Sequence, residues 1–166
     1  NQLRHPAMLA KMAITLDEVS GSRVILGLGA GWNQSEFDAL GLPFDNRVSR
    51  LEEAVQIIKP LMRHEKVNFA GRYYQTRNCQ ILPPGPRRAG PPLMIGAGGP
   101  RMLRLTAQSA DIWNITCTHP SSIDEPLAQM KQACADVGRD PATLPVTAHI
   151  TVAFPELGPL PWWVDD

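Results

Sequence analysis

The stretches VILGLGAGW (residues 24–32) and LMIGAGGPR (residues 93–101) decide the fold. Each begins with a short apolar run and continues into closely spaced glycines. A continuous apolar run that ends in glycine is typical of a strand buried on both faces, as in a parallel sheet. Pro100 suits the first position of a helix, where its missing N–H needs no partner. Each stretch therefore predicts a buried strand, a tight turn and a helix, in that order.

Strands and helices alternate along the rest of the chain. Apolar residues recur every three or four positions in the helical segments. In the first helix we expect one buried face that consists of Met8, Leu9, Met12, Ala13, Leu16 and Val19. Strands that alternate with helices imply right-handed crossovers and a parallel sheet. The predicted helices cover 6–19, 32–40 and 48–62. A further helix begins at 100, and another is capped by Ser121 or Ser122 and runs to 137. The predicted strands cover 24–28, 93–96, 112–115 and 146–154, and residues 67–69 and 72–74 form a predicted hairpin.

The composition excludes several classes of function. The 166 residues carry 16 Lys and Arg against 16 Asp and Glu, so the formal net charge is zero and no basic field attracts nucleic acid or an anionic membrane. No stretch approaches the roughly 20 apolar residues of a membrane span. Three widely spaced cysteines fit neither a disulfide framework nor a CxxC metal site, and the four histidines have no ligand spacing. We therefore expect a cytoplasmic protein without a metal, a membrane anchor or a nucleic-acid partner.

The two glycine turns carry the candidate chemistry. Glycine lets backbone N–H groups approach an anion closely, and the start of the following helix adds positive potential. A phosphate-bearing cofactor is the expected ligand, although tight turns of this kind also occur without one. The first turn departs from the GxGxxG dinucleotide pattern because Trp32 occupies the sixth position. It also fits the GxGxG turn of class I methyltransferases, but a hairpin and a proline-rich loop follow where that fold has a strand with an acidic end.

Short motifs occur in a distinctive order over roughly residues 1–116. They are RHPA (4–7), LAK (9–11), TLD (15–17), SG (20–21), GLGAGWN (27–33), FAGRYY (69–74), PP (91–92), GAGGPRMLRL (96–105), AD (110–111) and WN (113–114). In this order and spacing they resemble the luciferase-like monooxygenase family. The resemblance is closest to the branch that uses coenzyme F420, a deazaflavin, in place of FMN.

This resemblance implies an α/β fold of the TIM (β/α)8 barrel type, which needs about 250 residues. The chain would be a fragment with the equivalents of strands four to seven. Residues 1–166 would form one partial barrel domain, with an irregular tail at 155–166. We expect the four main strands to be mutually parallel, adjacent in sequence order, and covered by helices on one side only. Helices on both faces would instead indicate a doubly wound nucleotide-binding fold.

The family resemblance also implies a function. The chain would belong to an oxidoreductase in which F420 carries a hydride to or from a small organic substrate, as a homodimer when full length. The alternative within the family is an FMN-dependent monooxygenase. Alternatives of another class are a methyltransferase with the GxGxG turn, or a half-barrel without catalytic activity of its own.

The resemblance places cofactor contacts at the carboxyl ends of the strands. The second turn would hold the phosphate through its backbone, the first turn would line the ring, and the end of the next strand would form the rim. Arg101 would add a charge-assisted contact, or else be a solvated helix residue. Trp32 stands where the sugar-phosphate dehydrogenase branch has an acidic residue, so that reaction is not expected, and no catalytic residue is assigned. The implied cofactor-binding residues are Gly31, Trp32, Ala97, Gly98, Gly99, Arg101, Asn114 and Thr116.

Five further side chains have simpler expected roles. The His5 ring should cap the start of the first helix. Tyr73 and Tyr74 should pack the hairpin on the barrel. Glu52 and Glu53 should lie on the outer side of their helix as solvated charges.

Overall fold

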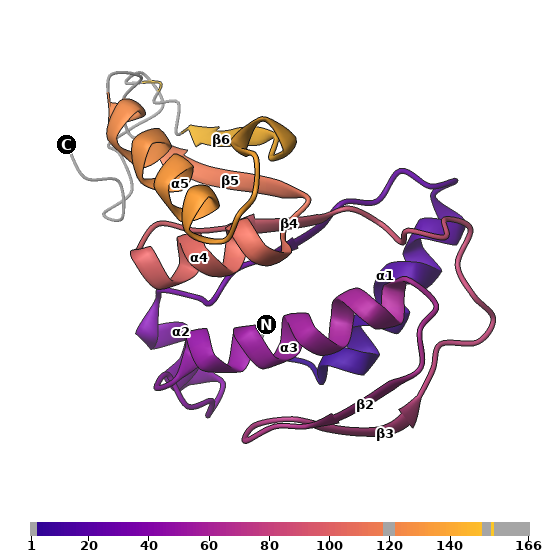
Figure 1. The fold of residues 1–166 in the computed structure, drawn as a ribbon. Coiled ribbons are helices and arrows are strands. Elements are labelled where there is room, and N and C mark those ends of the chain that lie inside the picture. Colours follow the sequence, from indigo (N-terminus) through magenta and orange to yellow (C-terminus); the bar gives the residue numbers. More distant parts are fainter. Residues whose placement is uncertain (1–2, 118–121, 151–153, 155–166) are drawn as a thin grey trace.

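The computed structural model describes residues 3–117, 122–150 and 154, and its main element is a four-stranded sheet (Figure 1). The strands lie in the order β1-β4-β5-β6, and every neighbouring pair is parallel, which confirms the predicted order and direction. Residues 151–153 of the last predicted strand and the predicted tail at 155–166 lie outside the described residues. The strands are β1 (Leu26–Leu28), β4 (Leu93–Gly96), β5 (Ile112–Cys117) and β6 (Val146–Ile150).

The helices are α1 (Pro6–Val19), α2 (Gln34–Ala39), α3 (Arg47–Met62), α4 (Pro100–Ser109) and α5 (Asp124–Asp136), and a short 3-10 turn (Pro141–Thr143) precedes β6. They form a continuous layer in which α1 packs on α3, α3 on α4 and α4 on α5. His5 caps α1 as predicted, because its Nδ1 accepts a hydrogen bond from the Ala7 N–H at 3.2 Å. Within the described part of the chain, no helix has the length and apolar character needed to cross a bilayer.

Among the residues that the structure describes, helices cover only one face of the sheet. The side chains of Leu93, Ile95, Trp113 and Ile115 are buried on that face, whereas Asn114, between two of them on β5, is on the opposite face and partly exposed. Figure 1 shows α4 and α5 on the same side of β4 and β5. This one-sided cover confirms the prediction and excludes the doubly wound sheet, which has helices on both faces. In a closed barrel the uncovered face is the interior.

The buried face of α1 is only partly the predicted one: Ala13 is buried as predicted and Leu9 is partly buried, but the other four residues are not buried. Met8, Met12, Leu16 and Val19 are between 44% and 80% exposed. Both this set and the buried set have helical spacing, so periodicity alone does not distinguish them. The buried set has smaller side chains, which allow α1 to pack closely on α3. It consists of Pro6, Ala10, Ala13, Ile14 and Asp17.

A buried ion pair joins α1 to the proline-rich segment that precedes β4. The Asp17 side chain is fully buried, and its carboxylate accepts hydrogen bonds from Arg87 Nη2 at 2.5 Å and Nε at 2.8 Å. Arg87 Nη2 also donates to the Val24 carbonyl at 2.7 Å, and the Val24 N–H donates to Asp17 at 3.3 Å. Asp17 and Arg87 thus hold together α1, the residues just before β1 and the segment that precedes β4.

The small hairpin differs from its prediction in the second strand. It consists of β2 (Val67–Ala70) and β3 (Gln75–Cys79), so the predicted strand at 72–74 is wrong and those residues form the turn. The reason is Glu53, whose carboxylate accepts the N–H groups of all three turn residues at 2.8–3.0 Å. A tertiary contact overrides the strand preference of the tyrosines here. Glu53 is therefore a structural acceptor, and the expectation that it is a solvated charge is wrong.

The predicted packing role of the two tyrosines can be located in this hairpin. Tyr74 meets the His5 ring edge to face, with centroids 5.7 Å apart. The Arg50 guanidinium lies over the Tyr73 ring at 4.5 Å. Burial raises the pKa of Tyr74, and the nearby Arg50 charge opposes that effect. Both rings thus attach the hairpin turn to the helix layer.

Glu53→Gln is expected to lower the free energy of unfolding by about 1.5–3 kcal/mol, the value of hydrogen bonds to a charged group. An amide presents one oxygen to three N–H donors and turns a competing NH₂ group toward them. Urea unfolding measures the loss, and hydrogen exchange at 72–74 reports its location. Glu65→Gln is the matched control, because Glu65 is exposed and the same change there should stay within about 0.5 kcal/mol. Equal losses in the two variants would contradict the role given to Glu53.

Candidate functional site

The second glycine turn opens into a cavity of about 320 Å³ at the carboxyl ends of β4 and β5. In parallel α/β folds ligands bind at this edge of the sheet. Four of the predicted cofactor-binding residues come together there: Ala97, Gly98, Asn114 and Thr116. The wall is completed by Gly96, Trp113, Ile115, Pro126 and Gln129, of which the last two come from α5.

Gly98 and Gly99 leave the approach to this cavity open. A Cβ built on either glycine meets no atom within 4 Å, and neither has a left-handed φ. Their N–H groups donate to no acceptor within the described residues. Gly99 is the N-cap of α4, and no side chain caps this helix end. The fold itself does not require glycine at these two positions, and the free donors at a helix start are suited to an anion.

The first glycine turn has a different character. Gly31 has φ +86°, and a Cβ there would lie 2.7 Å from the Phe37 ring, so this glycine is required by the fold. Its carbonyl accepts a hydrogen bond from Arg47 Nε at 2.9 Å. Gly31 and the exposed Trp32 line a largely apolar cavity of about 360 Å³. An apolar wall that includes the aromatic side chains of Trp32 and Phe37 is suited to the flat ring of a cofactor or substrate.

Glu36 is a residue of this cavity that the sequence analysis did not select. It is the one titratable side chain, among the described residues, that lines either of the two cavities. Asn33, the N-cap of α2, donates to its Oε1 at 3.2 Å. Its position three residues after the helix cap is the sequence signal that could have placed it at this helix start.

Arg101 turns away from the glycine turn. Its guanidinium pairs with both carboxylate oxygens of Glu52, and it donates to Ser49 Oγ at 2.8 Å, so it links α4 to α3. The hydrogen bond to Glu52 raises the pKa of Arg101. Glu52 is accordingly an ion-pair partner, and the expectation that it is a free solvated charge is wrong. The Arg101 guanidinium is therefore bound to Glu52 and Ser49 on α3, and Arg101 is not among the residues that line the cavity beside Gly98.

The uncovered face of the sheet carries a row of polar side chains. Asn114 Nδ2 donates to Thr147 Oγ1 on β6 at 2.8 Å. Thr116 and His149 are the next partners along the same face. Thr147 and His149 were not selected from the sequence, although their alternation along a strand indicates that they share one face. Polar groups therefore line the interior side next to the predicted rim residues.

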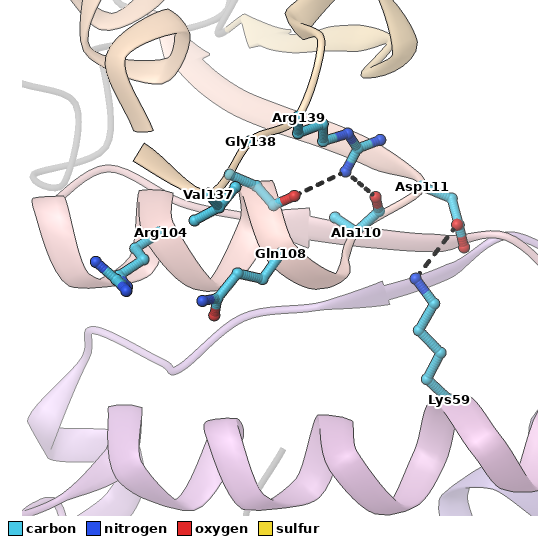
Figure 2. Close-up of a pocket in the computed structure, with 9 residues that line it drawn as sticks. Lys59, Arg104, Gln108, Ala110, Asp111, Val137, Gly138 and Arg139 are labelled. Atoms are coloured by element: carbon cyan, nitrogen blue, oxygen red, sulfur yellow. Dashed lines mark hydrogen bonds and ion pairs between the residues drawn. The ribbon is translucent and has the colours of Figure 1, made fainter. Parts of the chain in front are cut away.

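A separate cavity of about 530 Å³ lies at the opposite edge, where β5 begins (Figure 2). Figure 2 shows Arg139 bonded to the Ala110 carbonyl, at 2.8 Å, and Lys59 paired with Asp111, at 3.5 Å. Burial lowers the pKa of Lys59, and the Asp111 charge opposes that effect. Lys59 of α3 and Arg139, which follows α5, thus both bind the end of α4. In barrels this edge serves stability, so the cavity is separate from the candidate site.

Parallel strands in sequence order, one layer of helices and glycine turns at the carboxyl edge together define part of a (β/α) barrel with its ligand site at that edge. Residues 1–156 match the sequence profile of the luciferase-like monooxygenase family. The chain belongs to this family, and its fold is a part of the family's TIM barrel.

Individual relatives agree with this assignment. The chain is 28% identical over 148 residues to a 5,10-methylenetetrahydromethanopterin reductase from Archaeoglobus fulgidus, which covers 89% of this chain and 43% of the relative. It is 33% identical over 144 residues to a phthiodiolone/phenolphthiodiolone dimycocerosates ketoreductase from Mycobacterium tuberculosis. That match covers 85% of this chain and 38% of the relative. The solved coenzyme F420-dependent tetrahydromethanopterin reductase from Methanopyrus kandleri aligns with a TM-score of 0.77 at 25% identity, over 88% of this chain and 46% of that one. The chain thus spans less than half the length of the relatives it matches.

Proposed function

We propose that this chain forms the cofactor-holding part of an oxidoreductase that uses coenzyme F420 to transfer a hydride to or from a small organic substrate. The observation that carries the proposal is the open backbone at Gly98 and Gly99, where the two N–H groups donate to no acceptor among the described residues and an added Cβ would meet no atom within 4 Å. Such a cradle fits a phosphate that approaches the start of α4. The F420-dependent relative supports the choice of cofactor.

The proposed roles follow from where each residue lies. Gly98 and Gly99 hold the phosphate through their N–H groups, and Asn114 and Thr116 form the polar rim beside it. Trp32 lies against the ring in the apolar cavity and keeps water from it. When bound, the deazaflavin supplies two-electron hydride chemistry. The residues of this chain then contribute binding, orientation and exclusion of water.

A complete barrel that contains this segment is expected to bind F420 at least tenfold more tightly than FMN. Neither cavity presents a described side chain suited to shelter an oxygen adduct, whereas hydride transfer can rely on orientation and exclusion of water. Competition between the two cofactors, followed by their fluorescence, measures the preference. Turnover without oxygen is the second expected result.

Two outcomes would replace this proposal with another. Tighter binding of FMN together with strict dependence on oxygen would indicate the monooxygenase. Binding of neither cofactor by a folded barrel would indicate a barrel without this activity. The class I methyltransferase is excluded by the fold, because that class has a doubly wound sheet and this chain has part of a barrel.

A further inference from the structure

The Trp113 side chain makes one polar contact within the described part of the chain, and this contact is with the second glycine turn. Trp113 lies on β5 and is fully buried on the helix-covered face, next to Ile95 of β4. Its indole Nε1–H donates to the Ala97 carbonyl at 3.1 Å. This N–H is the only polar group of the side chain, and when buried it needs an acceptor. The sequence analysis gave Trp113 no role beyond its place in a family motif.

The contact fixes the orientation of one peptide plane. The bond between Ala97 and Gly98 is trans, so the Ala97 carbonyl and the Gly98 N–H point in opposite directions. Because the indole holds the Ala97 carbonyl, the Gly98 N–H points away from the indole N–H, and both Gly98 and Trp113 line the cavity. The Ala97 N–H donates to the Asn114 carbonyl at 3.3 Å. Consecutive residues of β5 thus hold both polar groups of Ala97.

We call the hydrogen bond from the Trp113 indole to the Ala97 carbonyl the clamp. Without it, few contacts would fix the backbone conformation of the turn. Glycine has the widest range of backbone conformations, and Gly98 and Gly99 are adjacent with open space around both. A ligand that binds a flexible turn loses affinity through the ordering of that turn, whereas a preformed turn avoids the loss. The hydrogen bond from the Trp113 indole to the Ala97 carbonyl supplies this preformed state from the wall of the cavity.

We propose that Trp113 is a positioning residue for anion binding: its indole N–H holds the Ala97 carbonyl and thereby aims the Gly98 N–H at the phosphate group of the cofactor. This inference rests on the proposed function, since it concerns the same cavity. It adds a group that acts through the backbone and does not contact the cofactor phosphate. The first turn has a similar arrangement, in which Arg47 Nε holds the Gly31 carbonyl.

The test compares Trp113→Phe with the unsubstituted sequence in a complete barrel that contains this segment. Phe keeps most of the ring and removes the N–H. The probes are F420 and the same deazaflavin without its phosphate. We expect Trp113→Phe to weaken F420 binding about tenfold and to change binding of the phosphate-free compound less than twofold. A purely structural role would weaken both equally, and that result would overturn the inference.

Thr106→Val is the matched control. Thr106 is fully buried, and its Oγ1 donates to the Met102 carbonyl within α4, so the substitution also removes a buried donor to a carbonyl but leaves the turn intact. We expect it to change neither affinity. If it weakened F420 binding as much as Trp113→Phe does, the loss would be general and the inference would be wrong.

The outcome separates this inference from the proposed function. If the unsubstituted protein does not prefer F420 to the phosphate-free compound, the proposed phosphate site itself is wrong. If it does and Trp113→Phe keeps the full preference, only the role of Trp113 is wrong. A second measurement covers a Trp113→Phe variant that does not fold: in the unsubstituted protein, NMR signals of the indole N–H and the Gly98 amide should shift with one dissociation constant as inorganic phosphate is added. An indole signal that stays still would overturn the inference.

Discussion

Arg87→Met is expected to lower the free energy of unfolding by about 3–5 kcal/mol, because it leaves the Asp17 carboxylate buried without its cationic partner. Asp17 is fully buried in α1, and Arg87 supplies two of its hydrogen bonds. The substitution also removes the donor to the Val24 carbonyl just before β1. Urea unfolding followed by circular dichroism measures the loss.

The double variant Asp17→Leu with Arg87→Met separates an unpaired charge from lost packing. Replacing both members of a buried ion pair by apolar residues of similar size is often nearly neutral. We therefore expect the double variant to recover most of the stability lost in Arg87→Met alone. A double variant that is less stable than Arg87→Met would show that the pair acts through packing, and the account given for Asp17 would be wrong.

Gly98→Val is expected to weaken F420 binding by about 2–3 kcal/mol, which is the value of one or two charge-assisted hydrogen bonds. A valine side chain at this position would enter the space proposed for the phosphate, and its Cβ would meet no protein atom within 4 Å. The melting temperature should therefore stay unchanged while the dissociation constant rises. Titration followed by cofactor fluorescence, in a complete barrel that contains this segment, gives the difference.

Gly98→Ala provides the graded control for this prediction. A single methyl group takes up less of the cavity, so its effect on F420 should lie between those of glycine and valine. The phosphate-free deazaflavin should bind all three proteins alike. If the Gly98→Val protein folds and its dissociation constant for F420 is unchanged, the proposal that the phosphate binds at this turn is wrong.

The order of strands could be predicted from the sequence because each buried strand carries its own local signal. Apolar runs that end in glycine locate β1 and β4, and the alternation with helices fixes their parallel direction. The cap of α1 at His5 was predictable for the same reason, since capping depends on neighbouring residues.

What the sequence could not supply are contacts between residues that are far apart in the chain. Glu53 sets the hairpin turn from α3, 19 to 21 residues away, and Arg87 reaches Asp17 across 70. Asp17 did carry a signal, because it shares the helical spacing of Ala10, Ala13 and Ile14. The same distinction holds for the candidate site. Its glycines were predictable because turns are local. The hydrogen bond from Trp113 to Ala97 and the ion pair between Arg101 and Glu52 were not, because they depend on tertiary packing.

The contacts that shape both glycine turns come from within the described part of this one chain. Arg47 holds the first turn and Trp113 the second, and each donor lies on an element that follows its turn in the sequence. The two turns and the groups that hold them therefore lie in one contiguous segment, residues 27–113. A redesigned barrel that keeps this segment is expected to keep both contacts.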